Sequence, residues 1–159
     1  MLVSRVECAL VAALFSILVG EENERGLAWH IEISIVDDQE IFAAIGEEGF
    51  ERLVAAFYRQ VPHDQILGPL YPANDLAGAK QRLRDFLIFR FGGPPRYIEQ
   101  RGHPRLRMRH APFPVDRTAR DHWLQLMQNA LSESEFPAEV KQLLWTYFES
   151  TADFMINKG

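Results

Sequence analysis

One stretch is the most informative part of this 159-residue chain: Gly102-His-Pro-Arg-Leu-Arg-Met-Arg-His-Ala-Pro-Phe-Pro114. Pro104 and Pro112 confine any helix between them to about two turns, because proline cannot continue a helix and the residue before it leaves the α region. Between these prolines lie several arginines and a single imidazole, that of His110. The stretch therefore predicts a short, rigid segment that carries one potential metal ligand among cations.

These residue types point to a haem. A neutral imidazole binds a metal through a ring nitrogen, and arginines pair with carboxylates. Haem offers both partners, an iron for His110 and propionates for the arginines. The chain has no Cys-x-x-Cys-His, so a covalent c-type attachment is excluded and the haem would be held non-covalently. We see no zinc-type ligand spacing, no phosphate-binding loop after a strand and no serine-nucleophile motif.

Length and composition fit one globular domain with a sizeable core. The chain is 47% hydrophobic and 25% charged, as is usual for soluble globular proteins. Its net charge of -5 argues against a general nucleic-acid binder, which is usually basic. Cys8, the single cysteine, cannot form an internal disulfide and is compatible with a reducing compartment. We expect a cytoplasmic protein with no nucleic-acid partner.

Residues 1–37 differ from the rest of the chain. The apolar run at residues 9–19 is too short for a comfortable membrane span and has no clear signal-peptide cleavage site. Trp29, Ile31, Ile33 and Ile35 alternate with more polar residues, which predicts a strand at 27–36. We expect an N-terminal extension at 1–37, or a start codon placed too far upstream, and no membrane association. The helical pattern described below occupies 38–159.

From Asp37 the apolar pattern has a helical period. Asp37 or Asp38 suits the N-cap of a first helix, which Gly46 and Gly49 should break. Further helices are expected over 50–61, 76–91, 117–130 and 137–155, with a turn region at 62–73, a stop at 92–95, a loop at 94–104 and caps at Asn74 or Asp75 and at Asp116. The sum is an all-α domain of about five helices plus the short histidine helix.

Three runs resemble group II truncated haemoglobins. They are Tyr-Pro-Ala-Asn-Asp-Leu-Ala-Gly-Ala at 71–79, Phe-Gly-Gly-Pro-Pro at 91–95, and Arg-Tyr-Ile-Glu-Gln-Arg-Gly-His-Pro-Arg-Leu-Arg-Met-Arg-His-Ala-Pro-Phe at 96–113. The last run is highly specific, and the resemblance covers residues 38–159 in order. It implies a truncated globin, a two-over-two helical sandwich around haem b. Where the family often has Gly-Gly between its first helices, this chain has Ile45-Gly46.

The resemblance also implies roles for individual residues. His110 corresponds to the proximal iron ligand, Tyr58 to the distal tyrosine and Trp123 to the indole that marks the subgroup. Without the resemblance, Tyr58 and Trp123 would be interpreted as core aromatics. Further haem contacts are implied for Tyr71 at the interhelical corner, Ala79 and Leu83 on the distal helix, Arg82, Tyr97 and Arg109 at the propionates, and Phe86, Met108 and Phe113 around the ring.

On the distal side the resemblance leaves no histidine, and Ala79 offers room without a hydrogen bond. Tyr58 O–H and Trp123 N–H are both donors, and they are the distal catalytic candidates. O2 takes negative charge from iron, so these donors should favour it over neutral CO. A hydrogen bond to a charged group contributes roughly 1.5–3 kcal/mol, so two of them could slow O2 release on the order of a thousandfold.

The sequence leaves several functions open. The chain could bind O2, NO and CO reversibly, with oxygen transport as one use. It could instead turn over NO or peroxide as a dioxygenase or peroxidase-like enzyme, and dioxygenation would need a separate reductase because no flavin or nicotinamide domain is present. A gas or redox sensor acting through a partner is the third option. Neither a monomer nor a homodimer is favoured.

Overall fold

The computed structural model describes residues 38–71 and 73–159. All the regular secondary structure in this part of the chain is helical, and it contains no strand. The expected strand at 27–36 lies outside the described residues. The elements are η1 (Asp38–Glu40), α2 (Ile41–Gln60), η2 (Val61–His63), η3 (Gly68–Leu70), η4 (Ala73–Asp75), α3 (Leu76–Arg90), α4 (Arg96–Arg101), α5 (Leu106–His110), α6 (Arg117–Glu133) and α7 (Ala138–Met155). None of the helices in the described part is long and apolar enough to cross a membrane.

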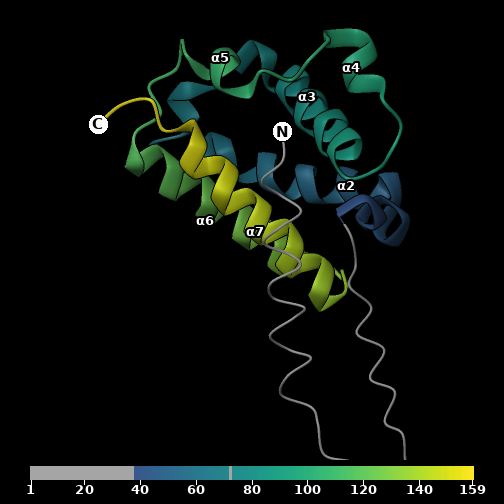
Figure 1. The fold of residues 1–159 in the computed structure, drawn as a ribbon. Helices are drawn as coiled ribbons and strands as arrows, with labels where there is room; N and C mark the ends of the chain where they lie inside the picture. The colour runs from purple at the N-terminus through teal and green to yellow at the C-terminus, as the bar shows by residue number, and fades with distance from the viewer. Residues whose placement is uncertain (1–37, 72) are drawn as a thin grey trace, which may run out of the picture. The chain divides into compact units, whose positions relative to one another are not determined.

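Two helix pairs form the body of the domain (Figure 1). α2 packs against both α3 and α6, α6 packs against α7, and the short helices α4 and α5 contact α3 and α7 respectively. This arrangement confirms the expected all-α, two-over-two sandwich. Its largest fully buried side chains come from four helices and two of their junctions: Ile41, Phe50, Leu53, Val54, Phe57, Val61, Leu87, Ile88, Phe91, Met127, Leu144 and Phe148.

The bend in α2 depends on a single glycine. Gly46 has φ 63° and ψ −178°, a conformation essentially reserved for glycine, and it separates two helical segments. The break expected at Gly49 is wrong, because Gly49 is helical and buried. A Cβ there would lie 2.8 Å from Ile45 Cβ and 3.3 Å from Phe136 Cε1, so Gly49 permits close packing. The chain thus makes its bend without a Gly-Gly pair.

The caps of the first helices differ from expectation. Asp38 begins η1, and Glu40, without a side-chain cap bond, occupies the N-cap of α2. Asp75 is at the N-cap of α3 as predicted, yet its carboxylate bonds Arg82 instead of a backbone N–H. At α6 the prediction is confirmed, since Asp116 Oδ1 accepts a hydrogen bond from the Ala119 N–H at 2.8 Å.

Residues 92–95 end α3 as expected, and they also let two segments approach closely. Gly92 has φ 92°, and a Cβ there would collide with the backbone oxygen of Gln39. The Phe42 N–H donates to the Phe91 carbonyl at 3.0 Å, which joins the start of α2 to the end of α3. The loop expected over 94–104 is wrong, because Arg96–Arg101 forms α4 and buries Tyr97.

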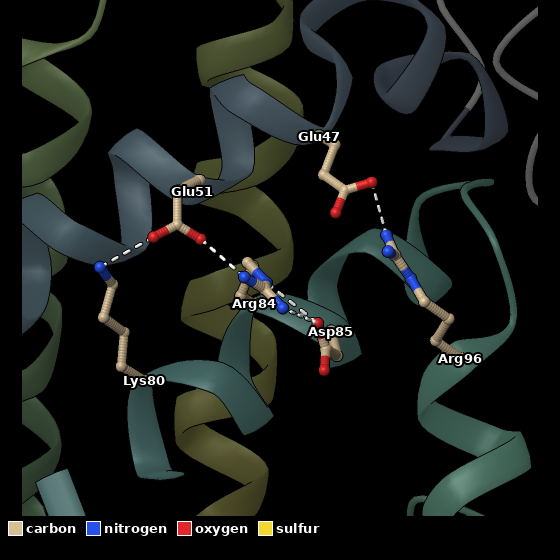
Figure 2. Close-up of polar contacts among 6 residues, drawn as sticks. All are labelled: Glu47, Glu51, Lys80, Arg84, Asp85 and Arg96. Atoms are coloured by element: carbon tan, nitrogen blue, oxygen red, sulfur yellow. Dashed lines mark hydrogen bonds and ion pairs between the residues drawn. The ribbon is translucent and has the colours of Figure 1, made fainter. Parts of the chain in front are cut away.

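Ion pairs tie α2 to α3 and α4 (Figure 2). Glu51 of α2 accepts contacts from Lys80 Nζ at 2.8 Å and from Arg84 Nη1 at 2.9 Å. Arg84 also donates through Nε and Nη2 to Oδ1 of Asp85, the one buried charged side chain among the described residues. Arg96 of α4 pairs with Glu47 of α2. A buried carboxylate is tolerated here because it is paired and hydrogen-bonded.

Candidate functional site

A cavity of about 620 Å³ is enclosed by residues from all the α-helices described above and by the segment before η4. That volume is within the range of sites that hold small molecules and cofactors. Every side chain that the sequence analysis singled out for a haem site lines this one cavity: Tyr58, Tyr71, Ala79, Arg82, Leu83, Phe86, Tyr97, Met108, Arg109, His110, Phe113 and Trp123.

His110 is the last residue of α5, and one of its ring nitrogens is already engaged. Nδ1 lies 2.8 Å from the Leu106 carbonyl oxygen. A carbonyl can only accept, so Nδ1 carries the proton and donates it. In the neutral ring Nε2 then keeps its lone pair, which is the form of histidine that binds metals. His110 is exposed in the cavity opening, so a ligand can reach it.

Two arginines that line the cavity, Arg82 and Arg109, are bonded to neighbouring groups. Arg109 donates from Nε to the Pro104 carbonyl at 2.8 Å and from Nη2 to the Arg101 carbonyl at 2.7 Å. These two bonds leave further guanidinium N–H groups for an anion. Arg82 pairs with Asp75 at 2.6 Å. Among the side chains beside them, Tyr97 is buried with its ring edge-on to Phe86.

The three distal aromatic side chains form one cluster. The rings of Tyr58 and Tyr71 meet edge to face at 5.7 Å, and Tyr71 is hydrogen-bonded to both Tyr58 and Trp123. The Trp123 N–H is a donor only, so it donates to the Tyr71 oxygen. Tyr58 and Tyr71 share a hydrogen bond in which either hydroxyl can be the donor. Both expected ligand donors therefore bond Tyr71 here.

Burial keeps these two phenols protonated. It raises the pKa of Tyr71 to about 12, although the hydrogen bonds from Trp123 and Tyr58 act in the opposite direction. Burial is also the main cause of the raised pKa of Tyr58. Both hydroxyls are therefore neutral donors at physiological pH. A Tyr71 hydroxyl that accepts from Trp123 can still donate its own proton to a further partner.

His63, His103 and His122 do not line this cavity. His122 is adjacent to Trp123 but does not line the cavity, because successive helical residues diverge by about 100°. Its Nδ1 lies 2.8 Å from Asp64 Oδ2. His63 is exposed. No group of three or more His, Cys, Asp or Glu side chains within residues 38–71 and 73–159 could hold a metal ion, so His110 is the metal-ligand candidate of the described part.

Sequence reasoning missed part of the cavity wall. The missed residues come mainly from α6 and α7 and include Val115, Ala119, Arg120, Tyr147, Phe148, Thr151, Ala152 and Met155. A signal existed for Arg120, which is three residues before Trp123 and therefore on the same helical face. The apolar face of α7 was visible as well, but its periodicity does not distinguish a core from a cavity wall.

A helical sandwich with a free imidazole nitrogen in a cation-rimmed cavity defines a haem protein of the globin class. The bacterial-like globin family matches residues 40–157. A group 2 truncated haemoglobin of Bacillus subtilis is 38% identical over 117 residues, covering 74% of this chain and 88% of the relative. The two-on-two haemoglobin-3 of Arabidopsis thaliana is 34% identical over 128 residues, covering 79% and 73%.

Solved structures agree. A haemoglobin from Chloroflexus aurantiacus superimposes with a TM-score of 0.72 at 46% identity, covering 74% of this chain and 98% of that one. A truncated oxygen-avid haemoglobin from Bacillus subtilis gives 0.70 at 38%, with the same coverage. The chain therefore belongs to the bacterial-like globin family, among the group 2 truncated haemoglobins, and its cofactor is haem b.

Proposed function

We propose that this chain binds O2, and related diatomic ligands such as NO and CO, at haem iron ligated by Nε2 of His110. The observation that carries the proposal is the Nδ1 contact of His110 with the Leu106 carbonyl at 2.8 Å, since it leaves Nε2 free to bind a metal at the cavity that His110 lines. Haem b supplies an iron whose sixth position is open to a diatomic ligand when one histidine occupies the fifth.

The donor set fits this cofactor. Arg82 and Arg109 line the cavity and would pair with the propionates, a charge-assisted contact. Tyr97 lines the same wall and would add a phenolic hydrogen bond. Phe86, Leu83 and Phe113 line the cavity and would supply apolar contact for the ring. Met108 and Phe113 are exposed apolar side chains at the cavity, at 66% and 40%, and a haem would cover such surface.

On the distal side, Tyr71 would donate its hydrogen bond to the ligand. Trp123 would fix its orientation by donating to its oxygen, and Tyr58 by sharing a hydrogen bond with it. This proposal differs from the expectation from sequence, in which Tyr58 and Trp123 contact the ligand themselves. A neutral donor aimed at a ligand that gains negative charge stabilises O2 more than CO, and a hydrogen bond of that kind contributes roughly 1.5–3 kcal/mol.

Retention of O2 by such donors suits redox chemistry or sensing better than delivery. The Bacillus subtilis relative is described as oxygen-avid, which supports tight binding in this chain. An NO- or peroxide-consuming activity would use the same cavity and would draw its electrons from a separate reductase.

Replacing His110 with glycine tests the ligand directly. We expect His110→Gly to lose the five-coordinate ferrous absorption spectrum and to recover it when imidazole is added, because the free base can enter the vacated position. His63→Gly is the matched control, since His63 is exposed and does not line this cavity. A His110→Gly protein with the parent's spectrum in the absence of imidazole would refute the assignment.

A further inference from the structure

The helix that carries His110 cannot hold its own position. α5 is only five residues long and contains no buried residue. Its N-cap, Arg105, has φ 41° and ψ 47°, a left-handed conformation that disfavours a non-glycine residue. A single helical turn with a strained cap has little stability of its own. The orientation of the His110 ring therefore depends on contacts from other elements.

Asn157, just after α7, makes the most complete of these contacts. Its side-chain Nδ2 donates to the His110 carbonyl at 3.1 Å and to the Phe113 carbonyl at 3.0 Å. Its Oδ1 accepts from the Val115 N–H at 3.0 Å. Its backbone N–H also donates to the Val115 carbonyl at 2.9 Å. One amide thus joins the end of α5 to both sides of the turn that follows.

The donors and acceptors around the side chain of Asn157 match an amide. The two N–H groups of Asn157 face two carbonyl oxygens, and its oxygen faces an N–H, so donors and acceptors are matched at each position. An aspartate of the same shape would set a carboxylate oxygen against the carbonyls of His110 and Phe113. An alanine would leave the Phe113 carbonyl to water and the His110 carbonyl with only the Phe113 N–H, which donates to it at 3.0 Å.

A second contact joins the same two elements. Arg107 of α5 donates from Nη1 to the Phe154 carbonyl at 2.6 Å, and its guanidinium lies 5.5 Å from the Phe154 ring centroid. The end of α7 and α5 are in direct contact along this edge (Figure 1). Arg107 and Asn157 therefore hold α5 near its start and at its end.

We infer that Asn157 is a positioning residue for the iron ligand, acting through the His110 carbonyl. The inference rests on the proposed role of His110. The His110 ring is oriented by two links: its Nδ1–H bonds Leu106 within α5, and its backbone is held by Asn157. Groups that hydrogen-bond a metal ligand fix its orientation, and so affect the metal–ligand bond as well as the affinity for the metal. Loss of the Asn157 contacts should therefore weaken the iron–histidine bond and broaden the distribution of its geometries.

Resonance Raman spectroscopy of the ferrous, ligand-free full chain tests this through the iron–histidine stretching band. We expect Asn157→Ala to shift or broaden the band and to release haem to an apo-myoglobin acceptor about tenfold faster, which corresponds to ~1.4 kcal/mol. Asn157→Asp should perturb both readouts at least as much, despite its matched shape. Lys158→Ala is the control, because Lys158 contacts Val115 only through its backbone N–H and the substitution keeps that bond.

The outcomes separate the two proposals. An unchanged band and haem-release rate in Asn157→Ala, in a parent that shows a normal iron–histidine band, would overturn the role of Asn157 and leave that of His110 standing. A lower melting temperature of the haem-free protein without a change in the band would also overturn it, since that is a merely structural effect. A parent with no iron–histidine band would refute both roles.

Discussion

Two neighbours contact the hydroxyl of Tyr71. Its oxygen accepts from the Trp123 N–H and shares a hydrogen bond with Tyr58, and burial raises the pKa of Tyr71 to about 12. Tyr71 is therefore a neutral phenol at physiological pH, and Trp123 and Tyr58 orient it. Our proposal makes Tyr71 the ligand donor and these two side chains its positioning groups.

Gly46 is the residue on which the bend of α2 depends. Its φ of 63° with ψ −178° strains any other side chain, although a Cβ would meet nothing within 4 Å. We therefore expect Gly46→Ala to lower the free energy of unfolding by about 1–2 kcal/mol through backbone strain alone. Urea denaturation of the haem-loaded protein measures this.

The control for that substitution is Ala43→Ser, at an exposed position three residues earlier in the same helix. Surface changes of this kind usually alter stability by less than about 0.5 kcal/mol. Equal denaturation midpoints for Gly46→Ala and the parent would show that the helix tolerates the substitution, and that the bend does not require glycine.

At the scale of elements, Glu51 joins α2 to α3. Hydrogen bonds from Lys80 and then Arg84 hold the pKa of Glu51 below its ordinary value of 4.5. A carboxylate with a lowered folded pKa stabilises the fold above its unfolded pKa, and this contribution is lost as the pH falls through the folded value. Because Glu51 is partly exposed, we expect the contribution at neutral pH to be only about 0.5–1 kcal/mol.

Glu51→Gln should therefore be less stable than the parent at pH 7, and the difference should shrink as the pH is lowered below about 4.5. Thermal unfolding at a series of pH values measures both effects. Glu48→Gln is the matched control: its partner Arg52 lies at 3.6 Å and both side chains are well exposed, so its effect should be small at every pH. A Glu51→Gln deficit that stays constant with pH would contradict the ion-pair explanation.

The helices of the two main pairs could be predicted from sequence because each has a wide apolar face of helical period. α4 could not, since its residues are surrounded by prolines and glycines. It forms because Tyr97 is buried against Phe86 and Arg96 pairs with Glu47, contacts that exist only in the folded chain. Gly49 was likewise misread as a breaker, because its packing against Phe136 is invisible in sequence.

The cavity residues were predicted from the resemblance, and above all from the specific run at 96–113. What sequence could not supply is the direction of each hydrogen bond. Tyr58 and Trp123 were recognised as donors, but that both are hydrogen-bonded to Tyr71 depends on the folded geometry. The contact of Asn157 with the His110 carbonyl was equally invisible, since it joins residues 47 positions apart.

At the scale of the whole molecule, the sandwich separates two tasks within one cavity. The α5 segment carries His110. Its own Arg107 bonds the Phe154 carbonyl of α7, and Asn157, which follows α7, bonds the His110 carbonyl. Tyr58 of α2, Tyr71, Ala79 and Leu83 of α3, and Trp123 of α6 line another part of the same cavity. A globin that holds O2 strongly is better suited to redox chemistry or sensing than to delivery.

The most direct test of this account is stopped-flow measurement of O2 release from the reduced, haem-loaded parent and from Tyr71→Phe. We predict slow release from the parent and release roughly 10- to 100-fold faster from Tyr71→Phe, because one hydrogen bond to a charged group is lost. Tyr58→Phe should fall between the two, since it removes only a positioning contact. Fast release from the parent, or equal rates in the parent and Tyr71→Phe, would contradict the account.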